Sequence, residues 1–443
     1  MDESGQTAEP VRSAGVTAAV QHALGWLVFG NALGVMIAIL LLLPQLNPWL
    51  GEWTYGRWMM VHMNTALFGW CSLPMLALLF KIYGVDRGRL AAWCRPVVWL
   101  WSAALLVGSY SWLQGHSSGK LFLDWTGYSR IFFPLALLAL WILLTLGFDR
   151  NREKGTPGRV ALFARLLGLL ALLLVPVAIY LSSSPDSYPP VNPSTGGPTA
   201  ASQLEATLGV VLILLAVPFG VARRREGLRR IAIFSCAVFF AEAVLTALLG
   251  FGDVSHRISS QYLSLASVLV WIPLIRAYYA HFEWTPATRR WRTAFLAWWA
   301  GLVITGWVMF LPGVLDRVKF TDALVGHSLL AVAGFLSAYV IFILVQILGE
   351  QDAWILNRTW SFYAWNLGVL AYVIVIMIAG WIEGADPAFT IVPGVARNTI
   401  YIIRLLTGIA MLAGSAEWLL ASLALKTKTA AVKTIRMRGV EVA

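Results

Sequence analysis

Two histidines lie inside long apolar segments, and their imidazole rings are the side chains best suited to chemistry. His62 stands in YGRWMMVHMNTALFGW and His327 in FTDALVGHSLLAVAGF. An ionisable side chain within lipid predicts a functional site. A neutral imidazole nitrogen can bind the iron of haem without adding charge to a dry environment. The alternative is that each ring only forms a hydrogen bond to a neighbouring helix.

Four further polar residues accompany these histidines. Near His62, Arg57 is expected to neutralise a haem propionate and Asn64 to orient the ring. Glu205 at the start of one apolar segment and Glu242 midway along another are candidates for a proton relay or for metal ligands. The alternative for Glu242 is a protonated carboxyl bonded to a neighbouring helix, and Glu205 can also lie in water.

The composition identifies the environment of these residues as a membrane. Of the 443 residues, 59% are hydrophobic and 12% charged, and the mean hydropathy is +0.72. A soluble domain carries about 25% charged residues, so this chain cannot cover a water-facing surface. The net charge of +11 comes from basic residues in short loops, which indicates sidedness in a bilayer and not nucleic-acid binding. The three cysteines form no CxxC or CxxCH, which excludes covalent c-type haem and a disulfide framework.

Apolar runs of about 18 or more residues predict an all-α bundle of transmembrane helices. The twelve predicted spans are Ala18–Leu43, Trp58–Ile82, Val97–Leu113, Ile131–Phe148, Val160–Leu181, Leu204–Val221, Ile231–Phe251, Tyr262–Tyr279, Thr293–Leu311, Thr321–Leu348, Trp360–Ile382 and Thr399–Leu425.

Loop charges predict the orientation of these spans. Basic residues concentrate in alternate connections and after Leu425, which places both termini in the cytoplasm. The predicted organisation is a cytoplasmic segment over residues 1–16, a membrane domain over 17–425 and a basic tail over 426–443. The first 16 residues are polar, so no cleavable signal peptide is expected. The sequence shows no short-period repeat and no convincing pair of interrupted helices. The proline-rich loop Ser182–Pro198 is expected on the outer side of the membrane, where it meets a partner.

Several motifs resemble subunit I of the haem-copper oxidase superfamily, closest to the branch of cbb3-type cytochrome c oxidase and nitric oxide reductase. The second predicted helix is similar through Tyr55-Gly56-Arg57, His62 and Asn64, and the tenth through Thr321-Asp322, Gly326-His327 and Gly334-Phe335. Weaker similarities follow in the eleventh and twelfth helices, at Ser361, Trp365, Gly368, Tyr372, Met377, Gly380-Trp381, Arg404-Leu405 and Gly408. The resemblance implies a twelve-helix bundle like cytochrome c oxidase subunit I.

The chain also departs from the family pattern. The family's tenth helix carries His-x-His, with one ligand for the reactive haem and one for the low-spin haem, but here His327 is followed by Leu329. Copper histidines are missing near Leu204–Glu205 and near Leu248–Asp253. Copper needs several imidazoles at one point, so copper is not expected. Residues two apart on a helix point about 200° apart, so His327 faces away from the low-spin position that His62 would serve.

The resemblance implies a haem-binding integral membrane subunit of a respiratory electron-transfer complex. It implies one b-type haem on His62 or His327, a bacterial inner membrane location, and partners that include other respiratory subunits and a c-type cytochrome. Electron transfer, or binding of a small gas at His327, would be its chemistry. Two alternatives stay open: a cofactor-free structural homologue, and a twelve-span transporter that uses Glu205 or Glu242.

Overall fold

The computed structural model describes residues 13–120, 122–153, 158–191, 203–249 and 256–425. The predicted tail over 426–443, and most of the predicted segment 1–16, lie outside these residues. The part of the proline-rich loop beyond residue 191 lies outside them too.

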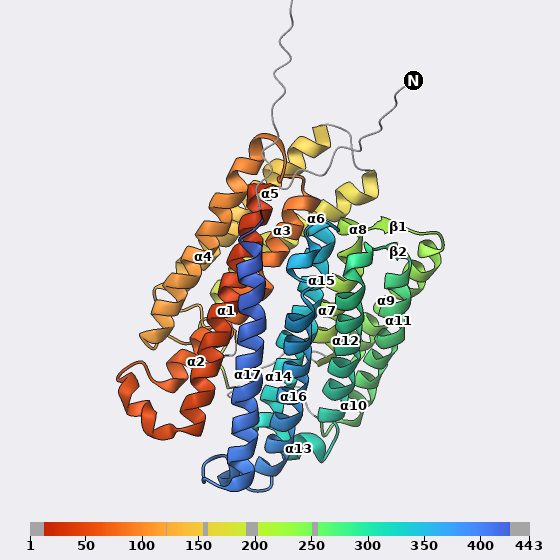
Figure 1. Cartoon of the computed structure of the whole chain (residues 1–443). Coiled ribbons are helices and arrows are strands. Elements are labelled where there is room, and N and C mark those ends of the chain that lie inside the picture. Colours follow the sequence, from red (N-terminus) through yellow and green to blue (C-terminus); the bar gives the residue numbers. More distant parts are fainter. Residues whose placement is uncertain (1–12, 121, 154–157, 192–202, 250–255, 426–443) are drawn as a thin grey trace, which may run out of the picture.

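The described chain is almost entirely helical (Figure 1). Long uninterrupted helices are α1 (Ala14–Leu42), α4 (Ala91–Leu113), α5 (Ser129–Glu153), α6 (Arg159–Ser182), α7 (Gln203–Ala216), α9 (Leu228–Leu249), α12 (Arg289–Met309), α16 (Thr359–Glu383) and α17 (Val395–Ser422). Shorter elements are η1 (Pro44–Leu50), η3 (Gly88–Leu90), α8 (Pro218–Val221), η5 (Pro286–Thr288), α13 (Val314–Val318), η7 (Ala353–Ile355) and η8 (Pro387–Thr390).

Three long helices change their hydrogen-bonding pattern partway along. Two contain a π-helical turn: α2 (Tyr55–Asn64) continues through η2 (Thr65–Cys71) into α3 (Leu73–Ile82), and α14 (Asp322–Leu329) continues through η6 (Leu330–Leu336) into α15 (Ser337–Leu348). The third joins α10 (Ser259–Leu265) to α11 (Trp271–Ala280) through the 3-10 turn η4 (Ala266–Val270).

Eleven helices among the described residues are long and apolar enough to cross a membrane, which indicates a multi-pass membrane protein. They coincide with eleven of the twelve predicted spans. The predicted ninth span, Thr293–Leu311, falls on α12, a helix of 21 residues that is not among the eleven. Its arginines and tryptophans lower its mean hydropathy. The count of twelve therefore stays a prediction.

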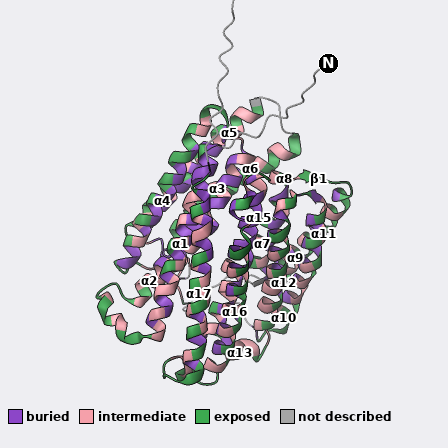
Figure 2. Ribbon diagram, in the orientation of Figure 1, coloured by how far each residue is buried: buried purple, intermediate pink, exposed green. Residues whose placement is uncertain are grey.

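The helices run side by side in one bundle, with α17 packed against both α1 and α16 (Figure 1). Buried side chains concentrate on the inward faces and exposed ones on the perimeter (Figure 2). The clearest peripheral helix is α6, which packs on α5 and buries only Leu169 among its residues. Apolar side chains on such outer faces suit contact with lipid.

The start of α1 and the end of α17 lie at the same end of the bundle. The side-chain amide of Gln21 donates a hydrogen bond of 3.1 Å to the Ser422 carbonyl. The same end carries a short antiparallel ribbon, in which β1 (Arg223–Arg224) pairs with β2 (Phe282–Glu283) (Figure 1). This end is called the arginine-rich end below, because Arg223, Arg224 and Arg225 are exposed there.

Candidate functional site

His62 is held by α1, the helix that packs against α2. Its Nδ1 lies 2.8 Å from the carbonyl oxygen of Gly30. A carbonyl only accepts hydrogen bonds, so Nδ1 carries the ring proton and Nε2 keeps its lone pair. One turn further along α1, a Cβ built on Gly34 would lie 3.0 Å from the Cε1 of His62. Glycine at this position therefore leaves the space that the imidazole occupies.

His327 is held in a comparable way by α12. Its Nδ1 lies 3.1 Å from the hydroxyl oxygen of Thr305. That hydroxyl donates its own proton to the Gly301 carbonyl at 2.8 Å, so it accepts from the His327 ring. A Cβ on Gly306 would lie 3.3 Å from the Cε1 of His327. Again the proton sits on Nδ1, and a glycine makes room for the ring.

The Nε2 atoms of both rings are available to a ligand. Neither Nε2 forms a hydrogen bond within the described part of the chain. Neither Nε2 is an enclosed polar atom without a partner, so each has some accessible surface. An imidazole whose Nδ1–H is fixed by a neighbouring oxygen, with Nε2 open, is the usual arrangement of a metal ligand. The residues around both rings therefore fit an axial haem ligand.

The two histidines occupy equivalent positions in two copies of one local structure. His62 and His327 each stand three residues before a π-helical turn and ten residues before a serine that follows it. The Ser72 hydroxyl donates to the Leu67 carbonyl at 2.9 Å, and the Ser337 hydroxyl donates to the Val332 carbonyl at 2.8 Å. Both bonds span five residues and close the widened turn. Single π-helical turns often accompany functional sites.

The sequences of the two copies match at the residues that shape them. The shared pattern is His, then Ala at the fourth following residue, Gly at the seventh, an aromatic residue at the eighth and Ser at the tenth: His62, Ala66, Gly69, Trp70, Ser72 and His327, Ala331, Gly334, Phe335, Ser337. We refer to residues 62–72 and 327–337 as the two histidine modules.

The neighbouring helices repeat as well. A Cβ on Gly69 would lie 2.6 Å from Trp26 of α1, and a Cβ on Gly334 would lie 2.9 Å from Trp298 of α12. Each tryptophan stands eight residues before the glycine that faces the imidazole. The sequence analysis did not identify this parallel pair of modules, whose helices continue through the π-helical turns and are not interrupted. The two modules run in the same direction along the bundle, so this is not an inverted repeat.

Within the described residues no hydrogen bond joins His62 to His327, but their modules touch. The π-helical turns η2 and η6 pack on each other. Across this contact the buried Trp70 indole N–H donates to the Ser337 hydroxyl at 2.8 Å. The two rings thus face different helices, α1 and α12, while their supporting turns are tied together.

Arg57 and Asn64, predicted to assist at His62, have other partners in the structure. The Arg57 guanidinium donates to the Leu113 carbonyl at the end of α4, at 2.9 Å. The Asn64 amide donates to the Met60 carbonyl at 2.9 Å and to the buried carboxylate of Asp124 at 3.0 Å. The acceptor for the His62 ring is the Gly30 carbonyl, a backbone group that sequence patterns do not single out.

The two candidate proton-relay carboxylates differ in their surroundings. Glu205 is exposed in the first turn of α7. Glu242 is buried within α9, where its Oε2 accepts from the Trp271 indole at 2.5 Å. The second oxygen, Oε1, is enclosed and has no partner within the described residues. Neither carboxylate is brought to a histidine module.

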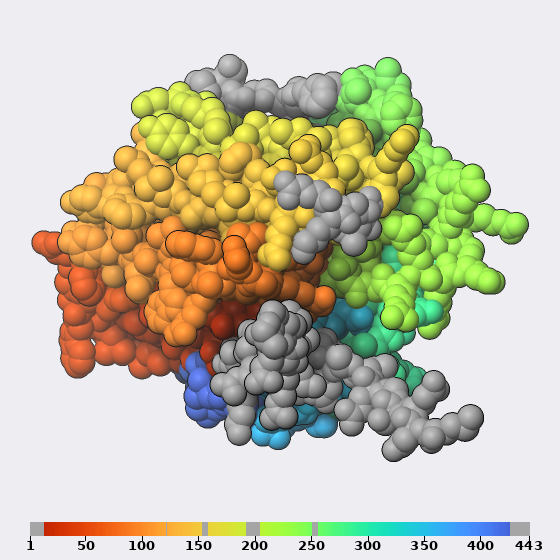
Figure 3. Space-filling model, turned by 90° about the horizontal axis from the view of Figure 1, so that it is seen from above, coloured from red at the N-terminus to blue at the C-terminus, as the bar shows by residue number. Residues whose placement is uncertain are grey.

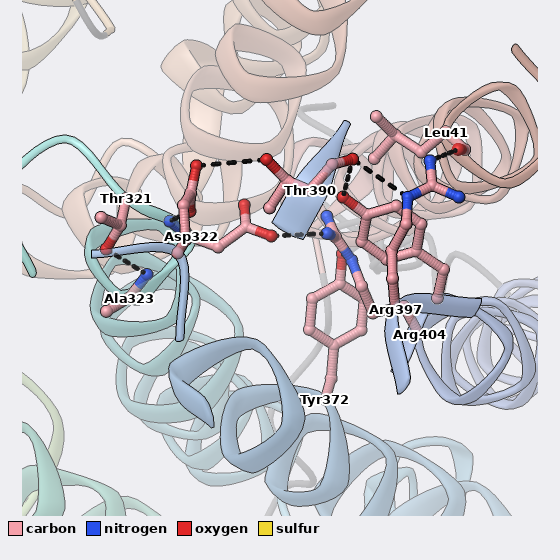
Figure 4. Close-up of polar contacts among 10 residues, drawn as sticks. Leu41, Thr321, Asp322, Ala323, Tyr372, Thr390, Arg397 and Arg404 are labelled. Carbon is pink, nitrogen blue, oxygen red and sulfur yellow. Dashed lines mark hydrogen bonds and ion pairs between the residues drawn. The ribbon is translucent and has the colours of Figure 1, made fainter. Parts of the chain in front are cut away.

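A buried charged cluster near His327 was not identified as a site from the sequence. At the start of α14, the Asp322 carboxylate lies 3.0 Å from the Arg404 guanidinium of α17, and only 5% of Arg404 is exposed (Figure 4). Arg404 also donates to the Tyr372 hydroxyl at 3.2 Å. Tyr55, which begins α2, lies within electrostatic range of Arg404. The cluster thus stands between the beginnings of the two histidine-bearing helices.

A second arginine ties this cluster to the rest of the bundle. Arg397 donates to the carbonyls of Thr390 at 3.0 Å and Leu41 at 2.9 Å, so it joins η8 to the end of α1 (Figure 4). The sequence does carry a signal for this cluster, because it places ionisable residues within apolar segments. Burying such residues costs free energy unless they are paired.

No three His, Cys, Asp or Glu side chains that could hold a metal lie together in the described ranges. His256, which follows the predicted copper-ligand region, bonds to Asp316 at 2.7 Å. The His256 ring beside it holds the pKa of the exposed Asp316 carboxyl below its usual value. Most of the region Leu248–Asp253 lies outside the described residues.

Comparisons with known proteins find a similarity among solved structures. No protein-family model matches the chain, and no curated protein matches it. Among solved structures, a haem-copper terminal oxidase that forms a dimer, studied by cryo-EM, aligns with 94% of this chain and 85% of its own length. The TM-score is 0.49 and the sequence identity is 11%. A match at this identity and score establishes neither a shared family nor a shared activity.

Proposed function

We propose that the chain is a haem-binding membrane subunit of the haem-copper oxidase subunit I type, within a respiratory electron-transfer complex. One observation carries the proposal: two imidazoles inside an apolar bundle each have Nδ1–H fixed by a neighbouring helix and Nε2 open. The same arrangement occurs in two equivalent modules, which supports a shared ligating role for the two rings.

The proposed cofactor is one b-type haem, and His62 is the better positioned of its two candidate ligands. The His62 ring bonds a peptide carbonyl at 2.8 Å, while His327 bonds a hydroxyl at 3.1 Å. A carbonyl acceptor raises the basicity of the ligating nitrogen and fixes the ring plane. When bound, a b-type haem supplies reversible one-electron transfer. Arg404, a buried cation that acts electrostatically on Tyr55 at the start of the His62 helix, is a candidate partner for its acidic groups.

The proposed topology has twelve spans, with α12 as the ninth and both termini in the cytoplasm. The arginine-rich end would then face the cytoplasm of a bacterial inner membrane. Other respiratory subunits and a c-type cytochrome are the proposed partners.

A reduced-minus-oxidised absorbance spectrum of the purified chain tests the proposal. We expect a Soret band that is lost in His62→Ala and retained in His327→Ala. Loss of the Soret band only in His327→Ala would identify His327 as the haem ligand in place of His62. A colourless protein, with both variants folded, would favour the cofactor-free structural homologue.

Proton-coupled transport is a second candidate function, favoured by the enclosed Oε1 of Glu242. A carboxyl oxygen without a partner in a dry interior suits a group that takes up and releases a proton. Reconstituted vesicles carrying a pH dye would test it. Acidification that is lost in Glu242→Gln and kept in Glu205→Gln would support transport, and no proton movement by the unmodified chain would exclude it.

A further inference from the structure

An open hollow lies on the outer face of α11, within the span Ser259–Ala280. It has a volume of about 360 Å³ and is lined by Ile272, Pro273, Arg276, Ala277 and Ala280. The small side chains of Ala277 and Ala280 leave the space, and the lining is apolar apart from Arg276. A hollow of this kind on a membrane-facing helix is shaped for a hydrocarbon chain.

Arg276 is an unusual residue for this position. It is exposed, stands one turn before the end of α11, and forms no ion pair or hydrogen bond within the described part of the chain. Arginine in an apolar segment extends its guanidinium toward the nearer membrane surface. For α11 that surface is the arginine-rich end, about 6 Å further along the helix axis.

Other arginines gather where α11 ends. The backbone N–H of Arg225 donates to the His281 carbonyl, at the C-terminus of α11, at 2.9 Å. Arg225 and Arg289 both act electrostatically on Arg292, so these three lie close together. Figure 3 looks onto this end and shows the light-green segment that includes the β1 region projecting at one edge.

Two acidic residues of the ribbon lie near these arginines: Glu283 stands opposite Arg223 and Glu226 follows Arg225. Glu226 and Glu283 are exposed, and neither forms an ion pair with these arginines in the described ranges. The site therefore combines an apolar hollow at membrane depth with an excess of arginines over acidic residues at the membrane surface. A ligand that matches both parts has a hydrocarbon chain and an anionic head.

We propose that this surface of α11 binds an anionic phospholipid. An acyl chain lies in the hollow along Pro273, Ala277 and Ala280, and the phosphate pairs with Arg276. Arg225, Arg289 and Arg292 add attraction at the headgroup level. The lipid would fix the α9–α11 region to one leaflet, independently of any haem.

The proposal is tested by titrating the full chain, in mild detergent, with dioleoylphosphatidylglycerol or dioleoylphosphatidylcholine and counting bound lipids by native mass spectrometry. We expect tighter binding of the phosphatidylglycerol. Arg276→Gln is expected to weaken it about fivefold, the factor for one arginine near a membrane surface. Ala277→Phe, which fills the hollow, should weaken binding of both lipids.

Arg87→Gln is the matched control, because Arg87 is another exposed arginine, in a loop away from α11. It should leave both affinities unchanged. Equal binding of the two lipids, or unchanged phosphatidylglycerol binding in Arg276→Gln, would overturn the proposal. Displacement of phosphatidylglycerol by inorganic phosphate alone would also overturn it, since the site would then take a free anion. If a variant fails to fold, the unmodified chain is measured again at high salt. Loss of its preference for phosphatidylglycerol would then support the proposal, and an unchanged preference would oppose it.

Discussion

The two histidine modules share a backbone plan but differ in what surrounds it. Residues 62–72 and 327–337 both present an imidazole, a π-helical turn and a closing serine. Five residues before the histidine, however, the first module carries Arg57 and the second carries Asp322. Arg57 bonds a helix end, whereas Asp322 pairs with the buried Arg404. At this position one local structure therefore meets a backbone carbonyl in the first module and an ion pair with a buried arginine in the second.

The manner of holding the ring differs too. His62 depends on a backbone carbonyl, which no side-chain substitution can remove, while His327 depends on the Thr305 hydroxyl. The first module is fixed by the packing of α1 itself. In the second module a single substitution at Thr305 would remove the hydrogen-bond partner of the ring.

Removal of the ion pair beside the second module should cause the largest loss of stability. Arg404→Leu would leave the partly buried Asp322 carboxylate without its partner, and we expect a loss of about 3 kcal/mol in stability, the lower end for a buried pair. Thermal unfolding in detergent measures it. The double variant Asp322→Leu with Arg404→Leu should recover most of the loss, because both charges are then gone.

Arg358→Leu serves as the control for that experiment. Arg358 and Glu417 form a more exposed ion pair, with 46% and 35% of their side chains accessible. A pair of this kind contributes about 0–1 kcal/mol. A loss in Arg404→Leu no larger than in Arg358→Leu would mean that the Asp322–Arg404 pair does not distinguish the second module.

A methyl group beside each imidazole would test how tightly the rings are held. Gly34→Ala places a Cβ 3.0 Å from the His62 ring, and Gly306→Ala places one 3.3 Å from the His327 ring. We expect Gly34→Ala to cost about 2 kcal/mol through overpacking and to lower haem content, and Gly306→Ala to cost less. Haem per chain and the unfolding midpoint check this. Equal effects on haem content would remove the preference for His62.

Substitution of the closing serines, Ser72 and Ser337, should reveal a smaller difference in stability between the two modules. Ser337→Ala removes a bond to the Val332 carbonyl and also leaves the buried Trp70 indole without its acceptor. Ser72→Ala removes only the bond to the Leu67 carbonyl. Expected losses are about 1.5 and about 0.5 kcal/mol in unfolding free energy. Similar losses would indicate that the Trp70–Ser337 bond adds nothing to the contact between the modules.

The sequence predicts the histidines and most of the membrane helices because lipid makes ionisable residues and apolar runs conspicuous. It does not predict the ring partners, since Gly30 and Thr305 lie 32 and 22 residues away from their histidines and only packing brings them together. The π-helical turns were missed for a different reason. Every residue of Thr65–Cys71 is also compatible with a regular helix, and the alternative depends on Ser72 and the fit against α1.

The smallest predicted effect concerns acid sensitivity beside the second module, where α13 packs against α14. The exposed Asp316 carboxylate accepts from the His256 ring and from the Gly313 backbone N–H, and Arg257 lies 3.5 Å away, so its pKa is lowered in the folded chain. Stability from this carboxylate is then fully present above its unfolded pKa of about 3.9 and is lost as pH falls through the lower folded value.

We expect acidification from pH 6 to pH 3 to lower the unfolding midpoint slightly more in the unmodified chain than in Asp316→Asn. The first module has no described counterpart of this contact, so a Gly34→Ala background should leave the difference unchanged. An identical acid response in the two proteins would show that the contact does not stabilise the α13 region.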